Sequence, residues 1–346
     1  MDILSVDVGY SSTKWEDDLD HLGLFPSTVT LDGWIGRDDE TKLPGLPQGK
    51  NRFKELIFEG KGYRVGDDPR GDLFSRDPNF HGNNEWKLLL AMAILSSHEK
   101  SPDKDSDNVV IENLALGIPI RNSDTKAMSR LKELTTLSFT DADTGREYTA
   151  TFNRVHIFSQ GLSILNYVED STLEDTIGLV DIGHNTLDLV LIHDGVPQRR
   201  PYSESFANGI FQVFNELREA YVAKGGNAGL TDFYIRRMIQ GRGLKHRGQF
   251  INMTDDINRA MANHWARISN LVVNKWADFL QDMQVITVAG GGALLMRDSL
   301  KDLDVSGVPV RYLNRSKFGE EIDIYVNADG YRRNVELLLE QETTRN

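Results

Sequence analysis

Residues 178–193 have the sequence GLVDIGHNTLDLVLIH, in which two short apolar runs surround an acidic segment that contains glycine. The apolar runs are Leu179–Val180 and Leu189–Ile192, and each has the length of a buried β-strand. The segment between them is rich in residues that favour turns. The pattern is typical of a β-hairpin whose turn carries polar, functional groups.

The turn of this hairpin contains the residue types that bind a phosphate group. Gly183 allows the backbone to bend and to come close to a ligand. Consecutive main-chain N–H groups at His184 and Asn185, together with the hydroxyl of Thr186, can surround phosphate oxygens. Asp181, at the end of the first strand, can hold a hydrated Mg²⁺. We therefore predict a phosphate-binding loop here.

A second segment of the same kind lies near the N-terminus, so that one such hairpin begins each half of the 346-residue chain. Its first strand is expected at residues 3–6, and Asp7 follows as a second candidate for orienting Mg²⁺ through water. The groups predicted to contact phosphate belong to Gly9, Ser11, Ser12, Thr13 and Lys14. By itself an Asp-x-Gly turn could equally be a plain hairpin. Two copies indicate two related domains that face each other across a nucleotide.

A third glycine-rich segment follows an apolar run near the C-terminus. Residues 285–294 read VITVAGGGAL, which predicts a buried strand, a glycine turn at Gly290, Gly291 and Gly292, and the start of a helix. Three consecutive glycines leave room for a flat group such as adenosine against bare backbone.

Taken together, the three segments resemble the phosphate 1, phosphate 2 and adenosine motifs of the ATPase superfamily that includes actin, the heat-shock chaperones and the sugar kinases. Within it the chain most resembles bacterial and archaeal actin-like ATPases of the plasmid-segregation (ParM/StbA) type. Smaller features that fit this branch lie at residues 56–67, 116–119, 158–161 and 326–331. The resemblance therefore spans almost the whole chain.

The resemblance implies an α/β fold in which an actin-like, ribonuclease H-like domain is duplicated around a nucleotide cleft. Domain I is expected at residues 1–158, completed by a C-terminal helix at 331–346, and domain II at 159–330. The crossover into domain II carries Gln160, which matches the family residue that positions the attacking water. Gly209 lies where family members bring a glycine close to the ribose or base, although a glycine at a helix start can also be a simple cap.

The function implied by the resemblance is hydrolysis of ATP, or GTP, with Mg²⁺, coupled to assembly into head-to-tail filaments. Gln160 and Asp181 are the expected catalytic residues, and Asp7 and Asp181 the expected metal ligands. A DNA-bound adaptor protein is a further expected partner. Other functions stay open: a small-molecule kinase of the same superfamily, for which Asp188 is the nearest candidate carboxylate, a non-polymerising ATPase scaffold, or a binding module that keeps the fold without turnover.

Composition excludes several other classes of protein. The chain has a net charge of −13, which argues against a generally nucleic-acid-binding surface. It contains no cysteine, so disulfides, iron–sulfur clusters and thiolate zinc sites are excluded. Its eight histidines show no pair at i, i+4, which disfavours other zinc sites. The N-terminus has no signal-peptide pattern, so a cytoplasmic protein without membrane segments is expected.

Other segments are predicted from periodicity and composition. Residues 123–137 are expected to form an amphipathic helix, residues 322–326 a strand, and residues 331–341 the final helix. The longest helix is expected to begin after a cap at Thr254 and to carry an apolar stripe from Ile257 to Met283. The basic run 236–247, RRMIQGRGLKHR, is interpreted either as a solvated, glycine-containing loop or as a segment that lines the nucleotide cleft, pairs with an acidic face of a neighbouring subunit, or contacts DNA.

Overall fold

The structure is a computed structural model of the chain, which divides into two compact units. It describes residues 1–31, 53–66, 80–120, 126–168, 175–300, 303–313, 316–317, 320–321 and 324–345. Unit 1 comprises residues 1–118, 122–158 and 328–346, and unit 2 comprises residues 119–121 and 159–327. The sequence placed these boundaries at 158/159 and 330/331.

Unit 1 is built on a mixed sheet with the strand order β3-β2-β1-β7-β9-β8-β5-β6-β4 among the described residues. The strands are β1 (Ile3–Val8), β2 (Ser12–Asp17), β3 (Leu22–Pro26), β4 (Val29–Leu31), β5 (Phe53–Phe58), β6 (Lys61–Gly66), β7 (Asn108–Ile118), β8 (Thr136–Asp141) and β9 (Arg146–Ser159). The predicted N-terminal hairpin is confirmed, because β1 pairs antiparallel with β2. On its other side β1 pairs parallel with β7, and the register places Ile3 opposite Asn113.

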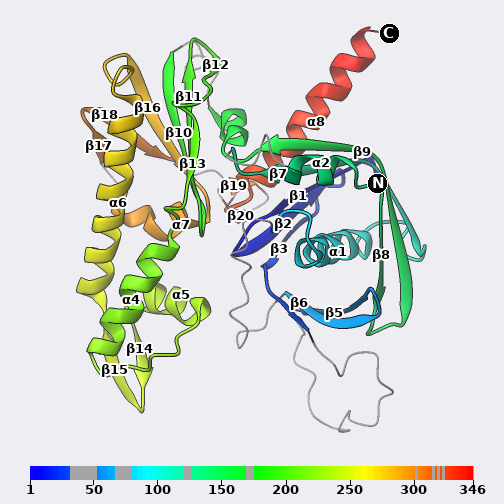
Figure 1. The fold of residues 1–346 in the computed structure, drawn as a ribbon, viewed down its shortest axis with the longest axis horizontal. Helices are drawn as coiled ribbons and strands as arrows, with labels where there is room; N and C mark the ends of the chain where they lie inside the picture. The colour runs from blue at the N-terminus through cyan, green and yellow to red at the C-terminus, as the bar shows by residue number, and fades with distance from the viewer. Residues whose placement is uncertain are drawn as a thin grey trace. The chain divides into compact units, whose positions relative to one another are not determined.

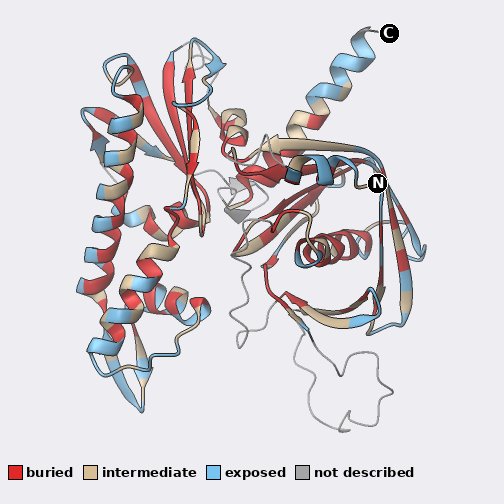
Figure 2. Ribbon diagram, in the orientation of Figure 1, coloured by how far each residue is buried: buried red, intermediate tan, exposed pale blue. Residues whose placement is uncertain are grey.

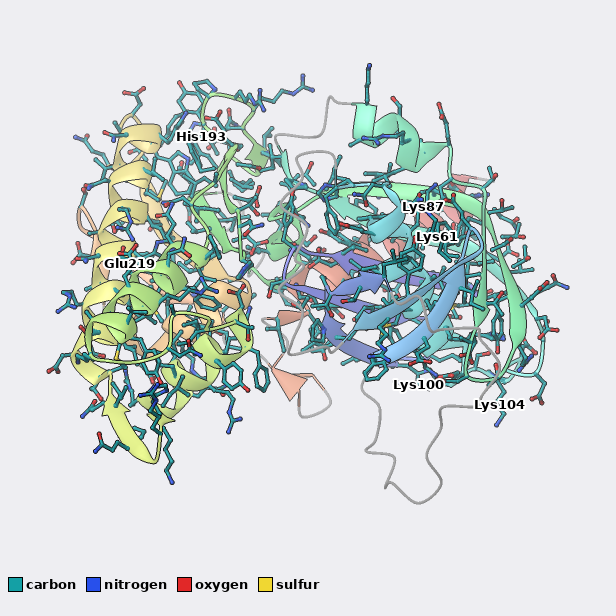
Figure 3. All side chains as sticks on the ribbon, turned by 60° about the horizontal axis from the view of Figure 1, so that its bottom comes forward. Lys61, Lys87, Lys100, Lys104, His193 and Glu219 are labelled. Carbon is teal, nitrogen blue, oxygen red and sulfur yellow. The ribbon has the colours of Figure 1, made fainter. Side chains whose placement is uncertain are left out.

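Helix α1 (Asn84–His98) packs against the concave side of this sheet and forms the centre of the unit 1 core. The side chain of Asn83 caps it by accepting a hydrogen bond from the N–H of Trp86. Residues from all sides of the helix are buried, as Figure 2 shows by its colour. Just beyond the helix, the ammonium of Lys100 lies 4.6 Å from the centre of the Trp15 ring (Figure 3).

The C-terminal helix α8 (Val326–Arg345) begins in unit 2 and belongs to unit 1 from residue 328 onward. Its Tyr331 is fully buried over Gly117 of β7, where an added Cβ would lie 2.0 Å from the tyrosine hydroxyl. The carboxylates of Glu16 and Asp329 pair with Arg332, and Asp329 also pairs with Arg333. A buried aromatic contact and buried ion pairs therefore attach α8 to the unit 1 sheet.

Unit 2 has a second mixed sheet, ordered β12-β11-β10-β16-β18-β17 in the described residues, with β13 paired to β11. Its strands are β10 (Thr176–Ile182), β11 (Leu187–His193), β12 (Val196–Pro197), β13 (Glu204–Phe206), β16 (Met283–Ala289), β17 (Asp304–Val305) and β18 (Val308–Tyr312). The β10–β11 hairpin is antiparallel and β10 is parallel to β16. This arrangement repeats that of β1, β2 and β7 in unit 1.

The helices of unit 2 are η2 (Leu162–Tyr167), α4 (Phe211–Ala223), α5 (Asp232–Gly241), α6 (Thr254–Trp276), α7 (Gly291–Met296) and η3 (Arg297–Ser299). Helix α6 buries one face and exposes the other along its length (Figure 2). The buried ring of Trp276 packs over Gly178 of β10, where a Cβ would lie 2.4 Å from it. A small hairpin of β14 (Gly243–His246) and β15 (Gln249–Asn252) joins α5 to α6.

Several predicted elements differ from the structure. Helix α2 covers Lys126–Lys132, residues 136 and 137 belong to β8, and the expected start at 123 lies outside the described residues. Val326, expected to end a strand, begins α8, and residues 322 and 323 are not described. Met283, expected on the long helix, begins β16. The basic run is not a loop, because most of it forms the end of α5 and strand β14.

Two very short strands, β19 (Ser316–Lys317) and β20 (Glu320–Glu321), pair with each other in unit 2. Among the residues that the structure describes, each helix is too short or too polar to cross a lipid bilayer.

Candidate functional site

The predicted phosphate loop of unit 2 is the tight turn between β10 and β11. The N–H of Gly183 donates to the carbonyl of Thr186 at 2.9 Å, which closes the turn. A Cβ on Gly183 would lie 3.1 Å from the same carbonyl oxygen, so the turn has little room for a side chain there. Asp181 and Asp188 sit opposite each other in the ladder on either side of the turn.

Three carbonyl groups of this loop accept hydrogen bonds from the start of helix α4. The N–H groups of Gly209, Ile210 and Phe211 donate to the carbonyls of Asn185, Gly183 and His184 at 3.1, 3.1 and 2.9 Å. The Cα of Gly209 packs directly against the loop backbone, since an added Cβ would lie 2.3 Å from the His184 carbonyl oxygen. That close approach explains the glycine, and its expected contact with a ribose or base stays a prediction.

Two N–H groups of the loop are not used in these contacts. Within the described residues, the backbone N–H groups of Asn185 and Thr186 donate to no protein acceptor. Paired N–H donors beside a turn are a recurrent way to bind an anion. The loop can therefore offer its N–H groups to phosphate oxygens while its carbonyls are held by α4.

The carboxyl groups of Asp181 and Asp188 lie close together in the protein interior. Their exposed fractions are 5% and 2%. Burial, and next the charge of Asp181, raise the pKa of Asp188 to about 7, although hydrogen bonds from Ser205 and Thr186 oppose the shift. The site therefore concentrates negative charge at the end of β10, which favours a cation or a shared proton.

Asn327 connects this carboxyl pair to the segment that contains Gln160. Its side-chain amide donates to Asp181 Oδ2 at 2.9 Å and accepts from the N–H of Gly161 at 3.3 Å. Gly161 has a φ of 82°, and a Cβ there would lie 3.5 Å from that of Asp188 and 3.8 Å from that of Asp181. Gln160 is therefore held, 8% exposed, next to the carboxyl pair.

Asn327 was not predicted as a site residue. The sequence indicated only that residues 326–331 resemble a family segment, and the contact to Asp181 spans 146 positions of the chain. An amide that follows a possible strand end has no local signal for this role, because its partner is defined by the fold of unit 2.

The triple glycine joins β16 to α7 beside the same strand end. Gly290 has a φ of 97°, and a Cβ there would lie 2.2 Å from Asp181 Oδ1. A Cβ on Gly292 would lie 2.7 Å from the carbonyl oxygen of Ile182. Gly291 differs, because a Cβ added there would meet nothing within 4 Å among the described atoms. Two of the glycines thus allow the backbone to pack on β10, and the third faces open space.

The corresponding loop of unit 1 has a carboxylate and a lysine at its centre. Lys14 Nζ lies 3.2 Å from Asp7 Oδ2, and the N–H of Gly9 donates to the Asp7 carbonyl at 3.1 Å. The hydroxyl of Thr13 shares a 2.9 Å hydrogen bond with Ser27. The N–H of Ser27 donates to the Ser11 carbonyl at 3.0 Å. The β1–β2 turn is therefore also bound to the segment that follows β3.

In both loops the residue after the Asp-x-Gly glycine points into the protein. Tyr10 stacks on Phe80 with ring centres 5.2 Å apart. His184 packs between Phe211 and Phe214, with ring centres at 5.5 and 5.4 Å, and its side chain is 3% exposed. The imidazole of His184 is therefore turned toward α4 and α5, and the predicted contact of His184 to phosphate would come from its backbone.

The residues of unit 2 fit Mg²⁺ as a partner of a bound phosphate. Within the described part of the chain, no three histidine, aspartate or glutamate side chains meet as a complete metal site. Magnesium at nucleotide sites takes one or two carboxylates and completes its shell with phosphates and water. Asp181 could supply such an oxygen ligand, and a cation beside it would offset the negative charge of Asp181 that helps to raise the pKa of Asp188.

The structure thus brings most of the predicted site together within unit 2: Gln160, Asp181, Gly183, His184, Asn185, Thr186, Gly209, Gly290, Gly291 and Gly292. Asp7, Gly9, Ser11, Ser12, Thr13 and Lys14 form a separate constellation in unit 1.

Comparison with known proteins gives two family matches that together cover most of the chain. Residues 5–162 match the model for actin-like proteins, N-terminal domain, and residues 179–302 match the model for the C-terminal domain of archaeal actin homologues of the MreB-like kind. No curated protein matches the chain by sequence.

Solved structures of similar fold cover almost the entire chain. The archaeal actin homologue Ta0583 in complex with ADP is 17% identical with a TM-score of 0.75, and the match covers 97% of this chain and 99% of that one. A ParM from a 15-stranded filament of Clostridium botulinum is 20% identical with a TM-score of 0.76, and covers 96% and 98%. A non-polymerisable pCBH ParM mutant is 20% identical with a TM-score of 0.75, and covers 97% and 99%.

Proposed function

The chain belongs to the actin-like proteins, and from this premise we propose that it is an ATPase that binds MgATP and assembles into nucleotide-dependent filaments. The main support for the proposal is that the same hairpin, with an Asp-x-Gly turn, occurs in both units. In each unit a strand ends in Asp-x-Gly, returns as an antiparallel partner, and lies parallel to a buried strand on its other side. Two such loops suit a ligand with several phosphate groups.

The roles of the residues follow from their contacts. The free N–H groups of Asn185 and Thr186 would bind phosphate oxygens, and Lys14 would bind one from unit 1. The Gln160 amide would orient the attacking water by donating and accepting at once, which requires position rather than a shifted pKa. Asn327 would position both Asp181 and the Gln160–Gly161 segment, because it binds the two of them.

Mg²⁺, when bound, would neutralise part of the phosphate charge and favour departure of the γ-phosphate. Asp181 and Asp7 are the carboxylates of the two loops that would hold it through water. The protein groups around Asp181 keep that carboxylate in place: Asn327 binds Oδ2, and the bare backbone of Gly290 allows close approach to Oδ1.

Self-association is the second part of the proposal. Support comes from the family and from the similar structures, one of which is a ParM filament and another a ParM mutant made unable to polymerise. Loops that bind the γ-phosphate would make subunit affinity depend on the nucleotide, so that hydrolysis weakens the filament. We further propose a cytoplasmic filament that positions DNA through an adaptor protein, as in plasmid segregation.

A small-molecule kinase is the weaker candidate. It needs a carboxylate free to contact the substrate, and Asp188 was the residue considered for that role. Asp188 is 2% exposed and accepts hydrogen bonds from Ser205, Thr186 and the backbone of Ile120. Its oxygens are engaged within the protein, and this observation favours the filament reading.

The test combines nucleotide binding with sedimentation of the purified protein. We expect MgATP, or a slowly hydrolysed analogue, to bind and to bring most of the protein into a high-speed pellet, while MgADP binds and leaves it in the supernatant. Asp181→Asn is the matched variant, nearly unchanged in shape, and should lose the difference between the two nucleotides. Pelleting that is equal with ATP, with ADP and without nucleotide would overturn the coupling, and no binding of either nucleotide would overturn the ATPase.

A further inference from the structure

The phosphate loop of unit 2 is connected by a buried side chain to a part of the unit that does not bind phosphate in the proposed function. The imidazole of His184 leaves the loop and passes between Phe211 and Phe214 of α4. Its Nε2 lies 2.9 Å from Asp232 Oδ2, and the two side chains are 3% and 2% exposed. Asp232 is the first residue of α5.

Asp232 is the centre of a charged cluster that joins three elements. Its other carboxylate oxygen, Oδ1, forms an ion pair with the guanidinium of Arg218 on α4. Arg218 also donates from Nε to the carbonyl of Leu230 at 2.9 Å, just before α5 begins. Burial alone would raise the pKa of Asp232, but the hydrogen bond and charge of His184 together with Arg218 outweigh it and lower that pKa. The carboxylate is therefore ionised and held from two sides.

Arg236, one turn further along α5, adds to the same cluster. Its guanidinium lies 5.4 Å from the centre of the Phe214 ring, the ring that also packs on His184. Buried charged groups are costly to assemble and are weak evidence for stability as such. They do fix one geometry, because a shift of either partner leaves a charge buried and unpaired.

Helix α5 continues directly into the β14–β15 hairpin. It ends at Gly241, Arg242 follows with a φ of 57°, and the carbonyl of Arg242 accepts the N–H of Met253 at 2.9 Å. Figure 1 shows α4, α5 and this hairpin grouped at one end of unit 2. A displacement of the start of α5 would therefore move the hairpin with it.

We propose that His184, Asp232 and Arg218 form an anchor that positions the phosphate loop and couples it to α5 and the β14–β15 hairpin. His184 is then a positioning residue whose side chain sets the loop backbone, and it is not a phosphate ligand. Through the anchor, a ligand that fixes the loop also fixes residues 232–252. The coupling to a nucleotide rests on the proposed function, whereas the anchoring of the loop does not.

The first measurement uses amide hydrogen exchange without nucleotide, on the full chain. Asp232→Asn removes the charge with little change of shape, and His184→Phe retains the packing between the two rings but removes the nitrogen contact. In both variants we expect the amides of residues 183–187 to exchange about tenfold faster, the effect of losing a charge-assisted contact. Strand β16, at residues 283–289, should keep its exchange rate, whereas general destabilisation of unit 2 would speed it as well.

Glu219→Gln is the control. Glu219 follows Arg218 on α4 but is exposed (Figure 3), so removing its charge should leave the loop unchanged. The double variant of His184→Phe with Asp232→Asn should be no faster than either single variant, because both remove one shared contact. Loop exchange equal to wild type in both single variants, or equal acceleration in β16, would overturn the anchor.

The second measurement repeats the exchange with a saturating slowly hydrolysed ATP analogue and Mg²⁺. In the wild type we expect the bound analogue to slow exchange both at residues 183–187 and at residues 232–252. In Asp232→Asn we expect it to slow exchange at residues 183–187 but not at residues 232–252. Protection of 232–252 that persists in the variant would overturn the coupling. If the wild type binds no nucleotide, the proposed function is overturned instead. The anchor is then tested by the first measurement alone, which uses no nucleotide.

Discussion

Asp181 and Asp188 face each other across one rung of the β10–β11 ladder, where a repulsive pair would normally be avoided. The surroundings treat the two carboxyl groups differently. Ser205 and Thr186 bind Asp188, whose pKa is raised to about 7 first by burial, whereas Asn327 binds Asp181. The two carboxyl groups thus have different hydrogen-bonding partners, which fits a metal-binding role proposed for Asp181 alone.

The proposed roles, a water-positioning amide at Gln160 and a metal-binding carboxylate at Asp181, predict different effects of Gln160→Ala and Asp181→Ala. Loss of Gln160 should leave nucleotide affinity nearly unchanged and lower turnover by about 10²-fold or more, because the water loses its orientation. Loss of Asp181 should abolish turnover and also weaken the dependence on Mg²⁺. Phosphate release and binding of a fluorescent ATP analogue measure the two effects. Undiminished turnover in both variants would remove these residues from the mechanism.

His264 is a buried histidine whose protonation affects the stability of the fold. It lies on α6 with no exposed surface, and among the described residues neither ring nitrogen has a hydrogen-bond partner. Burial, and next the charge of Arg267 on α6, lower its pKa to about 4, although the charge of Glu216 on α4 opposes the shift. The buried imidazole is therefore neutral near neutral pH.

Between pH 6.5 and 4 the unfolded chain binds a proton at His264 that the folded chain does not bind. The free energy of unfolding should therefore fall as the pH falls through this window, by up to about 3 kcal/mol from this residue, and should not depend on it above pH 6.5. His264→Phe should remove that part of the slope. Urea unfolding followed by tryptophan fluorescence would report it, since Trp265 is adjacent. His246→Phe, at a partly exposed site, is the control, and an unchanged slope in His264→Phe would contradict the assignment.

Among the elements, the hairpins and the long amphipathic helices could be predicted because their patterns are local. The turn at Gly183 lies between two apolar runs, and α6 repeats its apolar positions by three and four. The predicted helix at 123–137 ran too far, since Thr136–Asp141 alternates like a strand and pairs with β9. The glycines at 241 and 243 suggested a loop where α5 turns into β14.

The site was predictable to the extent that it consists of loops with their own signature. The glycines, hydroxyls and carboxylates of the two hairpins are contiguous in sequence, and their chemistry can be inferred from residue type. The supporting contacts are not. Asn327 reaches Asp181 across 146 positions, and Asp232 meets His184 from another helix. Such pairs follow from the packing of α4, α5 and α8 and leave no local pattern.

The turn at residues 290–292 yields a prediction in which neighbouring glycines differ. Gly291→Ala should fold normally, because its Cβ enters open space, and Gly291→Val should lower nucleotide affinity strongly if adenosine lies there. Gly292→Ala should destabilise unit 2 instead, since its Cβ would lie 2.7 Å from the Ile182 carbonyl oxygen. Thermal unfolding and titration with ADP separate the two effects. Unchanged affinity in a folded Gly291→Val would make the turn a packing feature alone.

At the scale of the whole molecule, the chain has a net charge of −13. The α5–β14–β15 segment differs from this average because it contains the basic run 236–247. It exposes Phe233, Tyr234 and Phe250 at 40, 42 and 55%. Arg237 and Lys245 are exposed on the same elements, with Arg237 5.8 Å from the centre of the Phe233 ring. Arg236, by contrast, is half-buried over Phe214, so it belongs to the interior and is not a free surface charge.

If this segment contacts an acidic face of a second copy, the contact is heterologous and builds an open filament. Arg237→Glu with Lys245→Glu should then raise the critical concentration for assembly about threefold to tenfold at low salt, and the difference should shrink at high salt because exposed charges are screened. Lys61→Glu with Lys104→Glu is the matched control: both lysines are exposed on unit 1 (Figure 3), and the pair changes the net charge equally. Light scattering against protein concentration with MgATP measures the result. Equal shifts in both double variants would attribute the effect to net charge, and normal assembly of the first would exclude the segment from the interface.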